Sequence, residues 1–174
     1  MFINPPTHNK QELKKLVLET IHISENATDH ELEFAKRVDL DEIKVLYDDF
    51  IVPHHLKSLW KIPYSKFDRF MRFISKDAKF QYPTKRPFTL AKEFGIPYKR
   101  PFKTTRSKGS SYPSGHAASV WFIAYYLAPK LSDLQKRALF RFVNKICKAR
   151  LVAGVHTIQD IKESRRLAKL FLEI

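Results

Sequence analysis

The sequence has 174 residues, of which 44% are hydrophobic and 29% are charged, and this composition excludes both a disordered chain and two ordinary-sized domains. The formal net charge is +14 at pH 7, which points to an anionic partner such as nucleic acid, a membrane surface or a phosphorylated small molecule. The single cysteine, Cys147, excludes an internal disulfide bond.

The charge is distributed unevenly along the chain. Residues 1–50 have a net charge of −5, whereas residues 51–174 have a net charge of +19. Residues 51–108 alone carry +12 and contain six of the ten prolines. We expect a single domain, residues 1–174, in which an acidic helical part, residues 1–50, packs on a basic core, residues 51–174.

Apolar residues recur at helical spacing along the first third of the chain. Residues 10–23 carry an apolar face typical of an amphipathic helix. Thr28 with Glu31, and Asp39 with Glu42, have the spacing of capping boxes. The sequence therefore predicts one helix over residues 10–23 and two short helices that begin after Thr28 and Asp39.

Serine residues mark the predicted starts of most later helices. Ser65 is expected to cap a helix with an aromatic stripe, and Ser114 to begin a strongly apolar one. Ser132 is expected to begin a helix that runs to about residue 152, and a last helix is expected over residues 157–172. Strict alternation and hairpin turn signals are absent from the sequence. These patterns predict an all-α fold, a helical bundle.

The sequence gives no sign of export or membrane insertion. Residues 1–6 have neither the basic leader nor the apolar core of a signal peptide. The longest apolar stretch, residues 120–128, falls short of the ~20 residues that a spanning helix needs. We therefore expect a cytoplasmic protein, and its basic surface is compatible with peripheral contact to anionic headgroups.

One short motif, Pro113-Ser114-Gly115-His116, is suited to binding an oxyanion at the start of a helix. Ser114 offers a hydroxyl group, and Gly115 lets an anion approach backbone N–H groups where the helix dipole favours negative charge. His116 lies one residue further on, where it can pass a proton to a leaving oxygen.

A second cluster of residues is suited to nucleophilic attack on phosphorus. His156 and Asp160 are four residues apart, so the carboxylate can hold one imidazole nitrogen and leave the lone pair of the other available. Arg150 would neutralise phosphoryl oxygens, and Lys79 and Arg86 would do so from another part of the chain.

Three motifs, in this order along the chain, resemble the three-part signature of the type 2 phosphatidic acid phosphatase superfamily. They are Lys79-x6-Arg86-Pro87, Pro113-Ser114-Gly115-His116 and Arg150-x5-His156-x3-Asp160. That superfamily includes bacterial non-specific acid phosphatases and vanadium haloperoxidases. The resemblance covers residues 79–170, and three motifs at matching spacing are far more specific than one. It implies a helical bundle of the acid phosphatase and vanadium haloperoxidase type, with its motifs within residues 79–160.

The resemblance also implies roles for the motif residues. His156 would be the nucleophile, Asp160 its partner and His116 the general acid. The residues implied to bind phosphate are Lys79, Arg86, Ser114, Gly115 and Arg150.

The implied activity is that of a metal-independent phosphatase that hydrolyses a phosphomonoester or pyrophosphate through a phosphohistidine. Such an enzyme needs no cofactor, and vanadate should inhibit it. Its substrate would be a phosphorylated small molecule or a lipid phosphate, and we do not expect nucleic acid as the partner. The sequence leaves both the substrate and the oligomeric state open.

The sequence leaves one choice of residues open and departs from the family pattern at two places. Lys92 and Arg100 form a reserve pair for the first motif, although seven residues lie between them instead of six. Ala149 stands where the family usually has a serine before the arginine of the third motif. Residues 157–159, Thr-Ile-Gln, replace a more usual run of an aromatic residue, proline and serine.

Two other functions stay open at this point. The same cradle can hold vanadate as a prosthetic group and oxidise halides with peroxide, although the chain is short for that class of enzyme. The basic segment, residues 51–108, also fits a catalytically vestigial helical module that binds nucleic acid or an anionic membrane.

Overall fold

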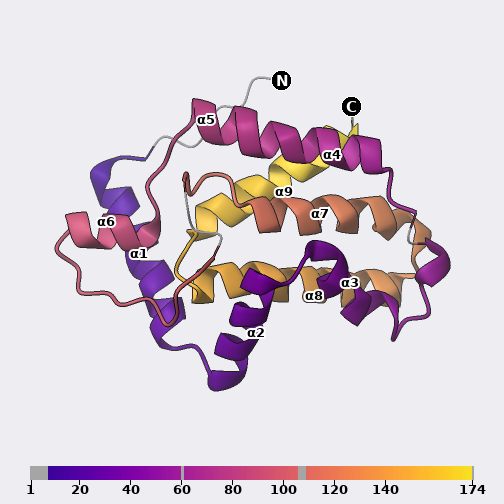
Figure 1. Ribbon diagram of the computed structural model, residues 1–174, viewed down its shortest axis with the longest axis horizontal. Helices are drawn as coiled ribbons and strands as arrows, with labels where there is room; N and C mark the ends of the chain where they lie inside the picture. Colours follow the sequence, from indigo (N-terminus) through magenta and orange to yellow (C-terminus); the bar gives the residue numbers. More distant parts are fainter. Residues whose placement is uncertain (1–7, 60, 106–108, 174) are drawn as a thin grey trace.

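The computed structural model describes residues 8–59, 61–105 and 109–173 (Figure 1). The predictions for residues 1–6, and the parts of the basic segment at residues 60 and 106–108, lie outside the described residues. The main helices are α1 (Lys10–Glu25), α2 (Asp29–Leu40), α3 (Ile43–Ile51), α4 (Tyr64–Arg72), α5 (Lys79–Gln81), α6 (Pro87–Glu93), α7 (Gly115–Leu127), α8 (Asp133–Val152) and α9 (Ile158–Glu173). Shorter or wider helical turns are η1 (Lys57–Leu59), η2 (Phe73–Ala78) and η3 (Ala128–Lys130). Every regular element within the described residues is a helix, so the predicted all-α class is confirmed.

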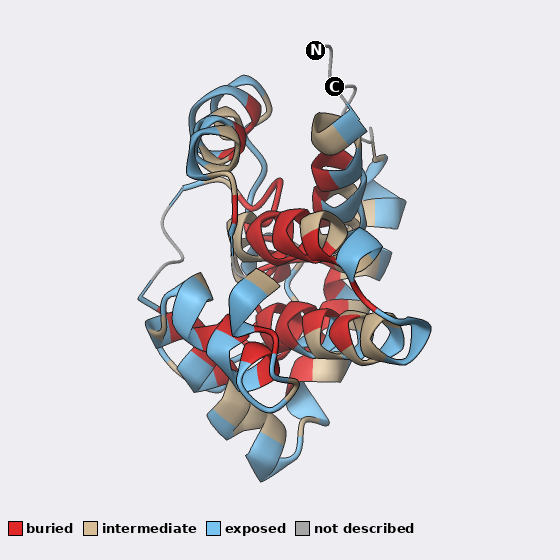
Figure 2. Ribbon diagram, turned by 90° about the vertical axis from the view of Figure 1, so that its right-hand side faces the viewer, coloured by how far each residue is buried: buried red, intermediate tan, exposed pale blue. Residues whose placement is uncertain are grey.

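The centre of the core is α7, which packs along α9 and against α8 and α4. Its sequence is apolar on all sides, and a helix of that kind is stable only when neighbours surround it. Figure 2 shows the buried residues gathered where the helices face one another, while the outer faces are exposed. The sequence pattern of α7 therefore places it inside the bundle.

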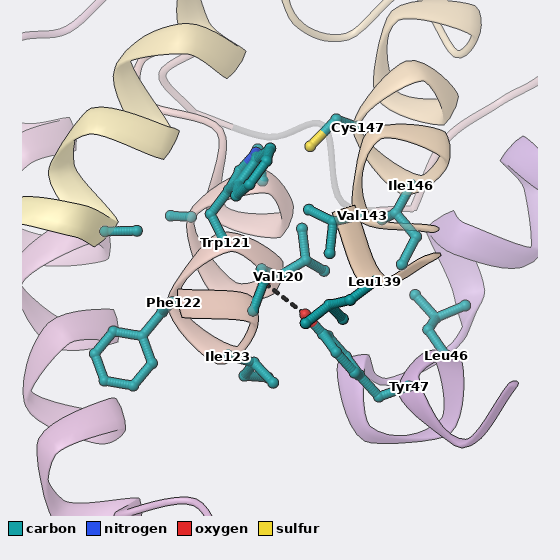
Figure 3. Close-up of a cluster of buried hydrophobic side chains, with 14 of the residues drawn as sticks. Leu46, Tyr47, Val120, Trp121, Phe122, Ile123, Leu139, Val143, Ile146 and Cys147 are labelled. Atoms are coloured by element: carbon teal, nitrogen blue, oxygen red, sulfur yellow. Dashed lines mark hydrogen bonds between the residues drawn. The ribbon is translucent and has the colours of Figure 1, made fainter. Parts of the chain in front are cut away.

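A buried polar contact ties α3 to this central helix. The hydroxyl of Tyr47 donates a hydrogen bond to the carbonyl of Val120 at 2.6 Å, drawn as a dashed line in Figure 3. Tyr47 is fully buried, so its hydroxyl requires such a partner. The side chains around it, Leu46, Leu139, Val143 and Ile146, are apolar, and the acidic part of the chain thus contributes to the main core.

Several predicted helix starts are confirmed by the observed caps. Thr28 and Glu31 form a reciprocal capping box at α2, and Ser132 and Gln135 form another at α8. Ser114 caps α7 by accepting a hydrogen bond from a backbone N–H of the first turn.

Two predicted caps are wrong. Asp39 does not cap α3, because it lies inside α2 on the buried face of that helix, and the residue that precedes α3 is Glu42. Ser65 does not cap α4, because that helix already begins at Tyr64, directly after Pro63. The N-cap position is occupied by Pro63, and Ser65 lies inside the first turn of the helix.

The basic segment is more helical than its proline content suggests. The short helix α6 begins at Pro87 and buries Leu90 and Ala91 against Val17 and Ile21 of α1. This packing fixes the position of Arg86, which immediately precedes α6.

Lys79 is positioned by a second helical stretch. The helices α4, η2 and α5 follow one another without interruption, and η2 has the wider turns of a π-helix. Such turns rotate the following residues relative to an ideal α-helix and are frequent next to functional sites. Among the described residues, no helix is both long enough and apolar enough to cross a membrane.

Candidate active site

The turn between α8 and α9 carries the third motif. Arg150 lies in the last turn of α8, and His156 lies just before α9 begins. Gly154 has a φ of +66°, and a Cβ atom there would overlap the hydroxyl of Tyr98 and lie 2.9 Å from its Cζ. Only glycine therefore suits both the backbone conformation and the space at this position.

Asp160 is held in place by hydrogen bonds to its carboxylate. The backbone N–H of Thr157 and the hydroxyl of Ser111 both donate to Oδ2 at 2.8 Å, and the N–H of Asp160 in turn donates to the Thr157 hydroxyl. Nδ1 of His156 lies 3.8 Å from the same Oδ2. The carboxylate thus caps α9 and faces the imidazole at the same time.

Arg86 approaches His156 from the other side. Its Nη1 donates to the carbonyl of Val155 at 2.8 Å and lies 3.1 Å from Nε2 of His156. Arg86 and His156 are 70 residues apart in the sequence. A guanidinium group can only donate hydrogen bonds, so Nε2 must be the acceptor. The imidazole proton is therefore assigned to Nδ1, the nitrogen that faces Asp160.

Burial and the neighbouring positive charge keep His156 neutral. The side chain is 3% exposed, and burial, together with the charge of Arg86, lowers its pKa to about 3 despite the opposing effect of Asp160. Burial alone would raise the pKa of Asp160, but the nearby imidazole and the hydrogen bonds from Thr157 and Ser111 lower it. The pair is thus a neutral histidine beside a carboxylate.

Lys79 holds the loop that leads into α7. Its Nζ donates to the carbonyls of Ser110 and Pro113 at 2.9 and 2.6 Å. Burial and the charge of Arg86 lower the pKa of Lys79 to about 8. Burial and the charge of Arg150 lower the pKa of Arg86 to about 10. Three cations thus influence one another in a small buried volume.

The second motif stands at the first turn of α7. Ser114 is fully buried, and its carbonyl accepts a hydrogen bond from the Ser164 hydroxyl of α9 at 3.0 Å. Apart from its two chain neighbours and the backbone of its own helix, no atom of the described residues lies within 4 Å of the position that a Cβ on Gly115 would take. The first N–H groups of a helix have no partner within the helix, so the space at Gly115 is suited to an anion.

His116 lines a cavity of about 460 Å³ beside the first turn of α7. The cavity also contacts Phe67 and Met71 of α4, and Ile43 at the start of α3. His116 is half-buried, in contrast to the fully buried His156. A proton donor at the edge of a cavity is suited to serve a leaving group that sits in it.

The structure joins the first and third motifs directly and the second through its backbone. Arg86 contacts His156, and Lys79 holds the carbonyl that precedes Ser114. The reserve pair makes different contacts, although the charge of Arg100 also lowers the pKa of Arg86. Lys92 is exposed, and Arg100 donates to the Thr104 hydroxyl and stacks over the ring of Phe88.

The two departures from the family pattern have structural consequences that can be read directly. Ala149 is buried in the main hydrophobic core. Thr157, in place of an aromatic residue, supplies the hydroxyl that accepts the N–H of Asp160 at the start of α9. The variation after His156 therefore preserves a cap for the helix that carries Asp160.

Sequence reasoning did not single out Ser111 and Asp39 as site residues, although their side chains bind the side chains of motif residues. Ser111 donates to Asp160, and Asp39 forms an ion pair with Arg150 at 3.0 Å. A signal for Asp39 exists in the sequence, because this carboxylate lies four residues after Ala35 and next to Val38, on the apolar face of α2.

Comparison with known proteins agrees with these motifs. The sequence model of the PAP2 superfamily matches residues 70–172, which include all three motifs. No curated protein matches the sequence. The crystal structure of Aquifex aeolicus LpxE superposes with a TM-score of 0.67 at 18% identity, and the match covers 100% of both chains. The chain therefore belongs to the PAP2 superfamily, and this membership confirms the phosphatase class of hydrolase that the motifs predicted. The similarity to LpxE, at 18% identity, supports the helical fold.

Proposed function

We propose that the chain is a metal-independent phosphatase that hydrolyses a phosphomonoester or pyrophosphate in two steps through a phosphohistidine on His156. The substrate would be a phosphorylated small molecule or a lipid phosphate. The observation that carries the proposal is the 3.1 Å approach of Arg86 Nη1 to Nε2 of His156. This contact marks a nitrogen with a lone pair, beside a cation that a phosphate group would also contact.

In the first step, Nε2 of His156 attacks phosphorus and the bond from phosphorus to the leaving oxygen breaks. His116 donates its proton to that oxygen, so the product leaves as an alcohol or as phosphate. The carboxylate of Asp160 stabilises the positive charge that develops on the imidazole, whose Nδ1 faces it at 3.8 Å.

In the second step, water attacks phosphorus while His116, now neutral, takes a proton from it. The bond from phosphorus to Nε2 breaks, and the electron pair returns to His156. Inorganic phosphate is released, and His156 and His116 regain their starting protonation states.

Positive charge at the site supports a mechanism without a metal ion. Lys79, Arg86 and Arg150 would neutralise the phosphoryl oxygens, and the first turn of α7 at Gly115 would add backbone N–H groups. In phosphoryl transfer most of the catalysis comes from positioning and charge stabilisation, which these groups can supply.

The His156→Ala variant tests the nucleophile. We expect turnover of 4-nitrophenyl phosphate to fall by roughly 10⁴-fold or more, because the variant lacks the proposed nucleophile. The control is His30→Ala, which removes an exposed histidine of α2. A folded His156→Ala protein with wild-type turnover would disprove the mechanism. Phosphate retained on wild-type protein after an alkaline quench, and absent from the variant, would support it.

The His116→Ala variant tests the general acid separately. Nitrophenolate leaves without a proton, whereas an alkoxide does not, so the variant should lose roughly 10²-fold more activity on an alkyl phosphate than on 4-nitrophenyl phosphate. Equal losses on both substrates would remove His116 from this role. Vanadate should inhibit wild type, and a chelator should leave its activity unchanged.

A further inference from the structure

A buried ion pair connects the site to the acidic part of the chain. Arg150 is 0% exposed and Asp39 is 1% exposed, and Nη1 of the arginine lies 3.0 Å from Oδ1 of the carboxylate. Asp39 lies on α2, outside the residues that match the PAP2 superfamily. A buried pair of charges is costly unless further hydrogen bonds complete it, so its other contacts are informative.

The second oxygen of Asp39 is also engaged. Oδ2 accepts hydrogen bonds from the backbone N–H of Thr105 at 2.6 Å and from its hydroxyl at 2.9 Å. These bonds and the charge of Arg150 lower the pKa of Asp39, although burial acts in the opposite direction. The residue is therefore a carboxylate that joins α2, the end of α8 and the loop at Thr105.

Arg150 in turn acts on the groups proposed to carry out the reaction. Its carbonyl accepts a hydrogen bond from the N–H of Val155, the residue before His156, at 3.3 Å. Its charge also lowers the pKa of both His156 and Arg86. An arginine side chain has many rotamers, and a fixed carboxylate on one edge of the guanidinium selects among them.

We propose that Asp39 is a positioning residue, which holds the guanidinium of Arg150 in the orientation that stabilises the phosphoryl group during transfer. The proposal rests on the proposed function. Asp39 does not touch the phosphoryl group and acts through Arg150. It also offsets one of three neighbouring positive charges while no phosphate is bound.

The Asp39→Asn variant is the primary test, because asparagine keeps the shape and removes the charge. We expect kcat/KM for 4-nitrophenyl phosphate to fall about 100-fold, as small misplacements of a catalytic group do. Vanadate, which adopts the geometry of the transition state, should bind more weakly by a similar factor. The affinity for inorganic phosphate, a product that demands less exact geometry, should change by less than about threefold. If Asp39 had a purely structural role, the variant would bind both anions more weakly to the same extent, or neither.

A matched control separates this pair from other carboxylates of the same region. Asp49→Asn breaks the exposed ion pair between Asp49 and Arg37, which joins α2 and α3. Exposed pairs contribute little, so this variant should keep kcat/KM within about twofold of wild type.

A double-mutant cycle tests whether Asp39 acts through Arg150. In an Arg150→Met background, Asp39→Asn should cause no further loss of kcat/KM, because the group that it positions is absent. The double variant also replaces both buried charges, which favours its folding. If Arg150→Met alone does not fold, Arg150→Gln, which also removes the charge, takes its place in the cycle.

Two results would overturn the proposal. One is an Asp39→Asn protein with kcat/KM and vanadate affinity within about twofold of wild type. The other is a loss of kcat/KM on Asp39→Asn that is equally large whether Arg150 is present or replaced. Vanadate binding measured by calorimetry requires no turnover. The proposal is thus tested even if wild type hydrolyses no phosphate ester, a result that would overturn only the proposed function.

Discussion

Two regions build the site, and they hold their side chains by different means. The first region comprises residues 150–160, and we call it the histidine turn. Its backbone is fixed by the ends of α8 and α9. Gly154 lies against Tyr98, and Asp160 caps the helix that follows. The groups that fix this turn are therefore different from His156, the group proposed to react.

The second region, which we call the cation segment, comprises residues 79–105 and 109–115. Much of its backbone is irregular, and its own cations hold it in place. Lys79 donates to the carbonyls of Ser110 and Pro113, and Arg86 donates to that of Gly109. In this segment the same side chains provide both structure and positive charge.

This difference predicts how each region responds to substitution. In the histidine turn, substitution of Gly154 should affect folding, and substitution of His156 should affect chemistry. In the cation segment, removal of one cation should affect both folding and chemistry. The comparison fails if a cation can be removed without effect, or if the glycines of the two regions behave alike.

Among the variants that test this comparison, the largest effect is expected for Arg86→Met in the cation segment. We expect kcat/KM to fall roughly 10³-fold, because a preorganised charge at the phosphoryl group is lost. Amide exchange at residues 109–111 should become faster, since Arg86 no longer holds the carbonyl of Gly109. Lys85→Met, which breaks an exposed pair with Glu93, is the control. Wild-type kcat/KM in Arg86→Met would remove the chemical role of this segment.

The next effect concerns the fold of the histidine turn. Gly154→Ala should lower the free energy of unfolding by about 3 kcal/mol, because a positive φ and a clash with Tyr98 act together. Denaturant titration measures the change, and adding Tyr98→Phe should restore part of the loss. A change below about 0.5 kcal/mol would contradict the packing argument.

Gly115→Ala should behave in the opposite way, because the space beside Gly115 is open. The free energy of unfolding should stay within about 0.5 kcal/mol of wild type, since alanine suits the first turn of a helix. By contrast, kcat/KM should fall about 30-fold, because the methyl group would occupy the space proposed for phosphate oxygens. Loss of stability without loss of activity would place the anion elsewhere.

The smallest effect is a dependence on pH. Burial lowers the pKa of Lys79 to about 8, so its ammonium is charged below that pH and neutral above it. A pH profile of kcat/KM should therefore fall above pH 8 by up to about tenfold per pH unit. Lys79→Arg should move this decline to higher pH, because arginine stays charged. An unchanged profile in that variant would assign the decline to another group.

The sequence predicted the helical fold well because its signals are local. The capping boxes at Thr28 and Ser132 and the apolar run after Ser114 each depend on residues within a few positions of one another. The same local reasoning failed at Asp39. Its spacing to Glu42 fits a capping box, yet the carboxylate is used by Arg150, a partner 111 residues away.

For the candidate site, the spacing of the motifs singled out the residues, but their geometry could not be inferred from spacing. The choice between Arg86 and Arg100 stayed open in the sequence, because both precede a proline and a phenylalanine. In the structure, α6 packs on α1 and brings Arg86 to His156, whereas Arg100 stacks on Phe88.

By itself the sequence determined that the chain is helical, that the three motifs of the PAP2 superfamily follow one another, and that the excess positive charge lies after residue 50. Only the tertiary structure decided which cation meets His156, why position 154 must be glycine, and that an acidic helix supplies the partner of Arg150. The reason is physical. Helix signals act between near neighbours, whereas burial, ion pairing and close packing depend on residues that only the fold brings together.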